Sequence, residues 1–147
     1  MKKIVIIAVP VLLVIAAAGF LFLRPGPPPP DEAALAREPG PIYTMAEPFV
    51  VNLADRGARH FAKVGVALQV SKLSAGRVPA AHGSDPVKIE EDPLVRDIVI
   101  AALQERTATA LSTRRGRDAV KRTIVAQVNK RTELKIIEVY FTEFAVQ

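Results

Sequence analysis

The chain has 147 residues, with 20 Lys and Arg against 15 Asp and Glu, a formal net charge of +5 and no cysteine. This length is enough for one domain of ordinary size, and the absence of cysteine excludes disulfides, thiol catalysis and thiolate metal sites. The basic balance favours an acidic protein, anionic lipid or nucleic acid as a partner, and does not choose among them.

The N-terminus predicts a membrane anchor. Residues 4–23 are uncharged and mostly apolar, and a helix of roughly 20 such residues crosses the hydrocarbon core of a bilayer. Two lysines precede this span, so residues 1–3 are expected in the cytoplasm and the C-terminal domain in the periplasm. The alternative is a cleaved signal peptide with Ala16–Ala18 at the cleavage site, but apolar sequence continues through Leu23, which favours a retained anchor.

A proline-rich linker is predicted next, over residues 24–42. It contains seven of the chain's 12 prolines, a composition typical of a semi-rigid polyproline II spacer. Residues 31–38 (DEAALARE) permit two helical turns, although an isolated helix this short is marginal in water. Two interpretations stay open for this segment: a disordered spacer, or a segment that becomes ordered against a partner near the membrane.

Residues 43–147 are expected to form the folded domain, and they begin with a hairpin. Phe49–Leu53 alternates apolar and polar positions, and residues 62–70 do so again after a turn at 55–57. This spacing predicts two paired antiparallel strands. Gly65 inside the second strand indicates a bulge or a close backbone approach.

Two helices and a last strand follow a Gly- and Pro-rich loop at 73–87. Asp92 is expected to cap the first helix, which runs to about Leu111 and is broken by residues 112–116. The second helix spans 117–131, with an apolar seam at Val120, Ile124 and Val128. The strand at 134–147 is expected to be an interior strand because apolar groups occupy both faces. These faces are predicted to carry Ile137, Val139 and a buried Phe141 on one side, and Tyr140, Phe144 and Val146 on the other.

No residue pattern predicts catalytic, cofactor or metal chemistry. The two histidines, His60 and His82, have no second ligand at metal-binding spacing. Acidic residues 90–92 precede a helix, where they complement the positive end of its dipole. Neither a nucleophile elbow nor a glycine-rich phosphate loop is present. An enzyme acting on a small-molecule substrate is therefore not expected.

Positive charge is concentrated in the second half of the domain. From Arg96 to Lys135 there are ten basic and four acidic residues. Nucleic acid is not expected as the partner, because aromatic stacking platforms are missing and the domain is exported. An acidic protein surface or anionic lipid stays open as the partner, and the alternative is a solvated helix face. The candidate partner contacts are Arg114, Arg115, Arg117, Lys121 and Arg122.

Four motifs in order resemble a known family. These are Pro48–Leu53 (PFVVNL), Val64–Val70 (VGVALQV), Pro93–Ala102 (PLVRDIVIAA) and Val139–Gln147 (VYFTEFAVQ). Together with the anchor and linker they resemble the flagellar basal body-associated protein FliL family over residues 43–147. The 73–87 loop does not resemble that of a typical member.

The resemblance implies a small α/β (α+β) domain similar to the stomatin/prohibitin (SPFH) domain, with a mixed sheet and packed helices. It also implies a single-pass inner-membrane protein at the flagellar basal body, without enzymatic activity or cofactor. Such a protein forms a homo-oligomeric ring, associates with the stator units and supports torque generation and motility. The alternative function is a membrane-tethered periplasmic SPFH-like scaffold without a flagellar role.

Overall fold

The computed structural model describes residues 31–57, 59–79 and 88–147. The predicted anchor at 4–23, the first part of the linker and His82 lie outside these ranges, and no helix within them is long and apolar enough to cross a membrane. In chain order, the elements are α2 (Glu32–Leu35), β1 (Pro39–Thr44), β2 (Phe49–Asn52), β3 (Phe61–Ser71), the 3-10 helix η1 (Lys72–Arg77), α3 (Asp92–Gln104), α4 (Ala108–Ser112), α5 (Arg114–Arg131) and β4 (Ile136–Val146).

The sheet is built around β3, the longest of the N-terminal strands. β4 pairs with β3 from Ala62 to Val70, along one edge. β2 pairs with residues 61–64 of β3 and β1 with residues 67–71, so these two strands share the other edge. The predicted β2–β3 hairpin is confirmed. All of these pairings are antiparallel, so the expectation of a mixed sheet was wrong.

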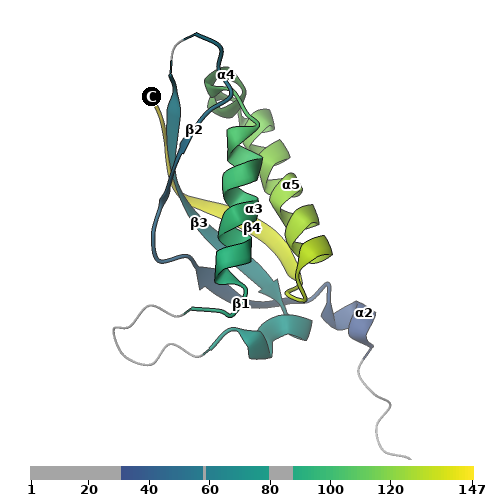
Figure 1. Ribbon diagram of the computed structural model, residues 1–147. Helices are drawn as coiled ribbons and strands as arrows, with labels where there is room; N and C mark the ends of the chain where they lie inside the picture. The colour runs from purple at the N-terminus through teal and green to yellow at the C-terminus, as the bar shows by residue number, and fades with distance from the viewer. Residues whose placement is uncertain (1–30, 58, 80–87) are drawn as a thin grey trace, which may run out of the picture. The chain divides into compact units, whose positions relative to one another are not determined.

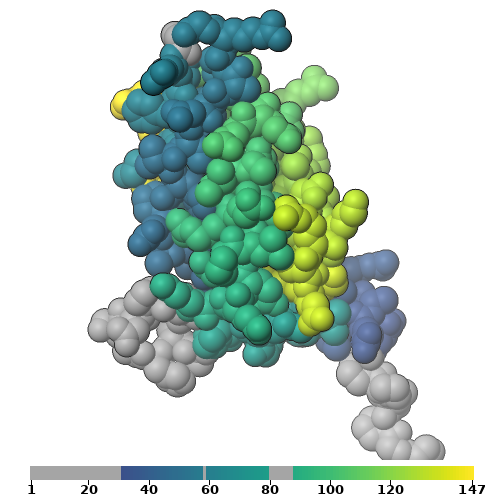
Figure 2. Space-filling view, in the orientation of Figure 1, coloured from purple at the N-terminus to yellow at the C-terminus, as the bar shows by residue number. Residues whose placement is uncertain are grey.

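The hydrophobic core lies between one face of this sheet and the helices α3 and α5, which run side by side across it (Figure 1). Alternate residues of β3 point into the core, and α3 fills the space between β2 and α5 (Figure 2). The predicted seam of α5 is confirmed, because apolar residues four apart face one side of a helix. The central side chains with no exposed surface are Val64, Val66, Leu68, Val95, Val99, Val120, Ile124 and Val128.

Regular structure begins earlier than the expected boundary at residue 43. Residues from Asp31 onward belong to the same compact unit as the rest of the domain. The Asp31 carboxylate caps α2 by accepting a hydrogen bond of 3.0 Å from the Ala33 N–H. β1 then starts at Pro39, which is tolerated because β1 is an edge strand. The second half of the predicted linker therefore includes a helical turn and the start of the sheet.

The first long helix is shorter than predicted, ending at Gln104 rather than near Leu111. A separate short helix, α4, begins after Thr107, whose hydroxyl accepts a hydrogen bond of 3.2 Å from the Ala110 N–H. The carboxylate of Asp55 accepts another from the Ala108 N–H at 2.8 Å. This tertiary contact holds the break in place, and a helical periodicity cannot reveal it.

α5 starts at Arg114, within the segment predicted to be a break. The hydroxyl of Thr113 caps it by accepting from the Gly116 N–H at 3.0 Å. A Cβ at Gly116 would lie 2.7 Å from the carbonyl carbon of Ala110 in α4. The glycine is therefore required by the close approach of two helices and does not end one.

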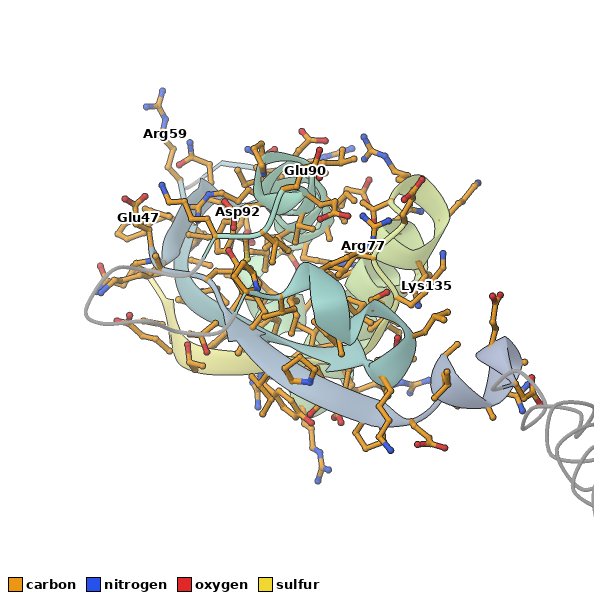
Figure 3. The ribbon with its side chains drawn as sticks, turned by 90° about the horizontal axis from the view of Figure 1, so that it is seen from below. Glu47, Arg59, Arg77, Glu90, Asp92 and Lys135 are labelled. Carbon is orange, nitrogen blue, oxygen red and sulfur yellow. The ribbon has the colours of Figure 1, made fainter. Side chains whose placement is uncertain are left out.

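The N-terminal end of α3 is held by contacts other than the predicted cap. Asp92 is the first helical residue, and no side chain caps the helix. Its carboxylate instead accepts a hydrogen bond of 2.6 Å from the Tyr43 hydroxyl. Burial, followed by this hydrogen bond and the adjacent negative charge, raises the pKa of Tyr43. The end view of the domain shows this region of α3 and also labels Arg77 (Figure 3), which forms ion pairs with Glu91 and Glu133.

β4 contains two bulges that change which side chains share a face. Val66 lies opposite Phe141 and Gly65 opposite Glu143, so Thr142 has no partner in β3, and Ile137 is an extra residue in the same way. Of the two alternatives predicted for Gly65, the register shift beside it confirms the bulge, and a Cβ at this position would overlap the Thr142 hydroxyl.

The bulges also correct the predicted faces of the last strand. Phe141, Phe144 and Val146 lie opposite inward-facing residues of β3 and share the core face, while Tyr140 lies on the other face. Among the described strands, β4 pairs with β3 alone, so it is an edge strand rather than an interior one. Phe141 is half-buried at this edge and not fully buried as predicted.

Candidate protein-binding surface

The candidate surface lies where α5 runs beside the edge strand β4. Arg117, Lys121, Val125 and Asn129 are spaced four residues apart, so they form one stripe along the helix. This stripe runs antiparallel to β4, because Arg117 lies beside Phe144 and Asn129 beside Ile136. The side chains of this stripe therefore determine which groups are exposed to solvent along this edge of the domain.

At its N-terminal end the stripe places cations over aromatic rings. The Arg117 guanidinium lies 5.6 Å from the centroid of the Phe144 ring, and the Lys121 ammonium lies 5.1 Å from that of Phe141. The two rings stack with their centroids 5.4 Å apart. Each cation–π contact at a partly exposed site contributes about 0.5–1 kcal/mol. Arg117 and Lys121 therefore shield two half-buried phenylalanines from water.

Arg117 has a second structural role at the junction of α4 and α5. Its guanidinium donates hydrogen bonds to the carbonyl oxygens of Leu111 at 3.0 Å and Ser112 at 2.9 Å. These carbonyls belong to the C-terminal end of α4, where a cation also complements the helix dipole. Arg117 is consequently committed to the fold, although the sequence placed it among the partner contacts.

The remaining three predicted contacts point to solvent. Arg114, Arg115 and Arg122 are exposed. Arg114 lies 3.7 Å from the Asp118 carboxylate, an exposed pair one helical turn apart that contributes little to stability. Arg115 and Arg122 are seven residues apart on the same face of α5, and neither forms an ion pair within the described part of the chain. The structure thus divides the five predicted residues into two structural and three freely exposed ones.

Arg114 and Arg115 lie in the first turn of α5, where the helix dipole disfavours positive charge. α5 has seven basic residues and one acidic residue, with no acidic residue in its first turn. The N-terminus of a helix carries partial positive charge, so cations there are unfavourable by up to about 1 kcal/mol each. No stabilising role in the described fold offsets this cost for Arg115. This placement favours a contact outside the domain over a solvated face.

Below the aromatic pair, a groove opens between α5 and β4. It has a volume of about 360 Å³. Its apolar lining comes from both elements, and charged side chains of both signs stand at its sides. The lining residues are Asp118, Lys121, Arg122, Val125, Ala126, Ile137, Glu138 and Val139.

Asn129 lies one helical turn beyond Val125, where α5 contacts β4 next to this groove. Its side-chain amide donates to the Ile136 carbonyl at 2.9 Å and accepts from the Ile136 N–H at 2.8 Å. This is the pair of bonds that a neighbouring strand would make, so α5 occupies the free edge of β4 at this one position. The groove and Asn129 were not predicted, because their positions depend on the bulges in β4. The spacing of the stripe residues, four apart along the helix, was the sequence signal that could have revealed the groove and Asn129.

Within the described residues, no cluster of three or more His, Asp or Glu side chains is arranged to hold a metal ion. His60 lies in the connection between β2 and β3, away from α5, and its backbone carbonyl accepts from the Leu53 N–H at 2.9 Å. The chemistry available at this surface is therefore positive charge, apolar contact and backbone hydrogen bonding.

Comparison with known proteins places these features in a family context. A family model described as "Flagellar basal body-associated protein FliL" matches residues 42–147. A curated protein from Aquifex aeolicus (strain VF5), named "Flagellar protein FliL", is 29% identical over 111 residues. That match covers 75% of this chain and 63% of the relative, so the chain spans less than two thirds of the relative's length.

Proposed function

The chain belongs to the FliL family of flagellar basal body-associated proteins, and from this premise we propose that it associates with the stator units of the motor and supports torque generation. The family is one of flagellar accessory proteins and is not known as a family of enzymes. The observation that carries the proposal is the family match over residues 42–147. The exposed arginines of α5 supply a surface for the contact.

In this proposal the basic surface, defined as Arg114, Arg115 and Arg122, meets an acidic surface of a neighbouring motor protein. Complementary charge would steer the two proteins together and fix their orientation more than it would raise affinity. Such a contact weakens as salt rises, because exposed charges are screened beyond about 10 Å at 0.1 M salt. Arg117 and Lys121 act indirectly, by holding the helix against β4.

The proposal includes a single-pass inner-membrane anchor at residues 4–23 with the domain in the periplasm at the basal body. An anchor confines the domain to a plane and raises the effective concentration of neighbouring copies. Weak head-to-tail contacts then close a homo-oligomeric ring around the stator. Similarity of the domain's fold to the stomatin/prohibitin (SPFH) domain is part of the same proposal.

Deletion of the gene in a flagellated host tests the proposal. We expect filament number to stay normal, while swimming in viscous medium falls more than swimming in buffer, because torque limits speed at high load. Loss of filaments would assign the protein to assembly instead. Unchanged motility at every load would favour the alternative of a membrane-tethered scaffold without a flagellar role.

Protease access tests the topology separately. A C-terminal tag should be digested in spheroplasts, and the protein should stay in the membrane fraction after carbonate washing. A protected tag would reverse the proposed orientation, and a shortened protein released from the membrane would indicate a cleaved signal peptide.

A further inference from the structure

The free edge of β4 is the feature of this surface that the proposed function does not use. Among the described strands β4 pairs with β3 alone, and its other edge faces the groove beside α5. At Ile136 the Asn129 side chain already forms hydrogen bonds with the backbone N–H and carbonyl of that edge. Between the two bulges, residues 138–141 continue as regular strand. An edge of this kind offers backbone N–H and C=O groups to an added strand.

The groove beside this edge suits the side chains of such a strand. Val125 and Ala126 of α5 face Ile137 and Val139 of β4 across it. Side chains of an added strand alternate between the two faces of the sheet, so every second one would enter the groove. Small apolar side chains would displace water from this apolar lining, which favours their binding.

The charged residues around the groove indicate which polar side chains an added strand would carry. Lys121 and Arg122 line the groove on the α5 side, and the helix carries seven basic residues against one acidic residue. Asp118 and Glu138 are the acidic residues of the lining. The surplus of positive charge along the helix favours an occupant with carboxylates on its groove-facing side.

We propose that β4 accepts an extended acidic segment of a partner protein as an added strand, with apolar side chains in the α5–β4 groove and carboxylates toward Arg122. This inference deepens the proposed function and rests on it for the partner's place in the motor. Its binding chemistry is tested in vitro, so failure of one does not imply failure of the other.

The test uses full-length protein in detergent micelles and a fluorescein-labelled, threonine-rich peptide whose even positions alternate valine with aspartate. Fluorescence anisotropy measures its affinity. Two matched peptides serve as controls: one carries lysine for aspartate, and the other carries N-methyl groups that block strand pairing but keep the charge. The acidic peptide should bind saturably and both controls should bind at least about tenfold more weakly.

Matched variants of α5 locate the site. Arg122→Glu should weaken binding of the acidic peptide about tenfold, because it places a carboxylate at the groove. Lys130→Glu makes the same charge change on an exposed residue of the same helix outside the groove lining, and should change affinity less than about twofold. Circular dichroism checks that both variants are folded.

Four results would overturn the inference. They are the absence of saturable binding to the wild type, equal binding of the N-methylated peptide, equal weakening by the two variants, and self-association of the protein that the acidic peptide reverses. The last would identify a second copy of this chain as the occupant of the groove.

Discussion

Asn129→Ala removes the contact by which α5 holds the free edge of β4. Two hydrogen bonds to Ile136, of 2.9 and 2.8 Å, are lost. Each contributes about 0.5–1.5 kcal/mol, or about 2 kcal/mol together. Alanine is the better helix former by about 0.5 kcal/mol. The net expectation is a loss of about 1.5 kcal/mol in the free energy of unfolding.

Urea denaturation of residues 31–147, followed by circular dichroism, measures this loss as a lower midpoint at unchanged slope. Lys130→Ala is the matched control, because Lys130 is an exposed neighbour on the same helix. It should change the free energy of unfolding by less than about 0.5 kcal/mol. A loss at Asn129 no larger than that of the control would refute the reasoning that this amide takes the place of a strand.

Three further substitutions test other parts of the fold. Gly116→Ala should lower the free energy of unfolding by about 1–3 kcal/mol through contact with the α4 backbone, whereas helix propensity alone predicts a gain of about 1 kcal/mol; a higher melting temperature would contradict the close approach. Phe141→Ala should cost about 2 kcal/mol, less than the 3–5 kcal/mol of a fully buried phenylalanine, and a melting-temperature change matching full burial would show that the ring is not half-exposed. Because burial and the hydrogen bond to Asp92 raise the pKa of Tyr43, its contribution is complete below the unfolded value of about 10 and is lost as pH rises above it. Wild-type stability should therefore fall more steeply above about pH 10 than that of Tyr43→Phe, and parallel curves would contradict this.

The elements with strong periodicity were predicted well from the sequence. β3 alternates apolar residues at period two, and α5 repeats Val120, Ile124 and Val128 at a period of four. The period-two residues of β3 and the seam of α5 both face the core, which a local pattern records directly. Gly65 was also interpreted correctly, because a glycine inside a strand has few other reasons to be there.

The predictions that failed depend on contacts between distant segments. The break before α4 requires Asp55 to reach the Ala108 N–H across 53 residues of sequence. The faces of β4 depend on bulges that only pairing with β3 defines. β1 was missed because Pro39 is typical of a linker, and its pairing with Ser71 is not visible locally.

The roles of the basic residues in α5 depend on distant contacts in the same way. Net charge pointed to this helix, and three of the five basic residues are exposed, while their contact with a partner stays a prediction. Charge alone could not separate Arg117 and Lys121, whose roles depend on the two phenylalanines of β4. Those rings were placed on opposite faces by the simple alternation that the bulges interrupt.

The most direct test of the central claim is the torque of single motors at high load, measured on tethered cells. One strain carries Arg115→Glu with Arg122→Glu, and the control carries Arg37→Glu with Arg59→Glu, which are also exposed residues outside α5. Arg59 projects away from the domain (Figure 3). We expect lower torque in the first strain alone, with normal filaments and protein levels in both. Equal torque in the two strains, with both proteins folded and abundant, would contradict a role for the basic surface in the motor.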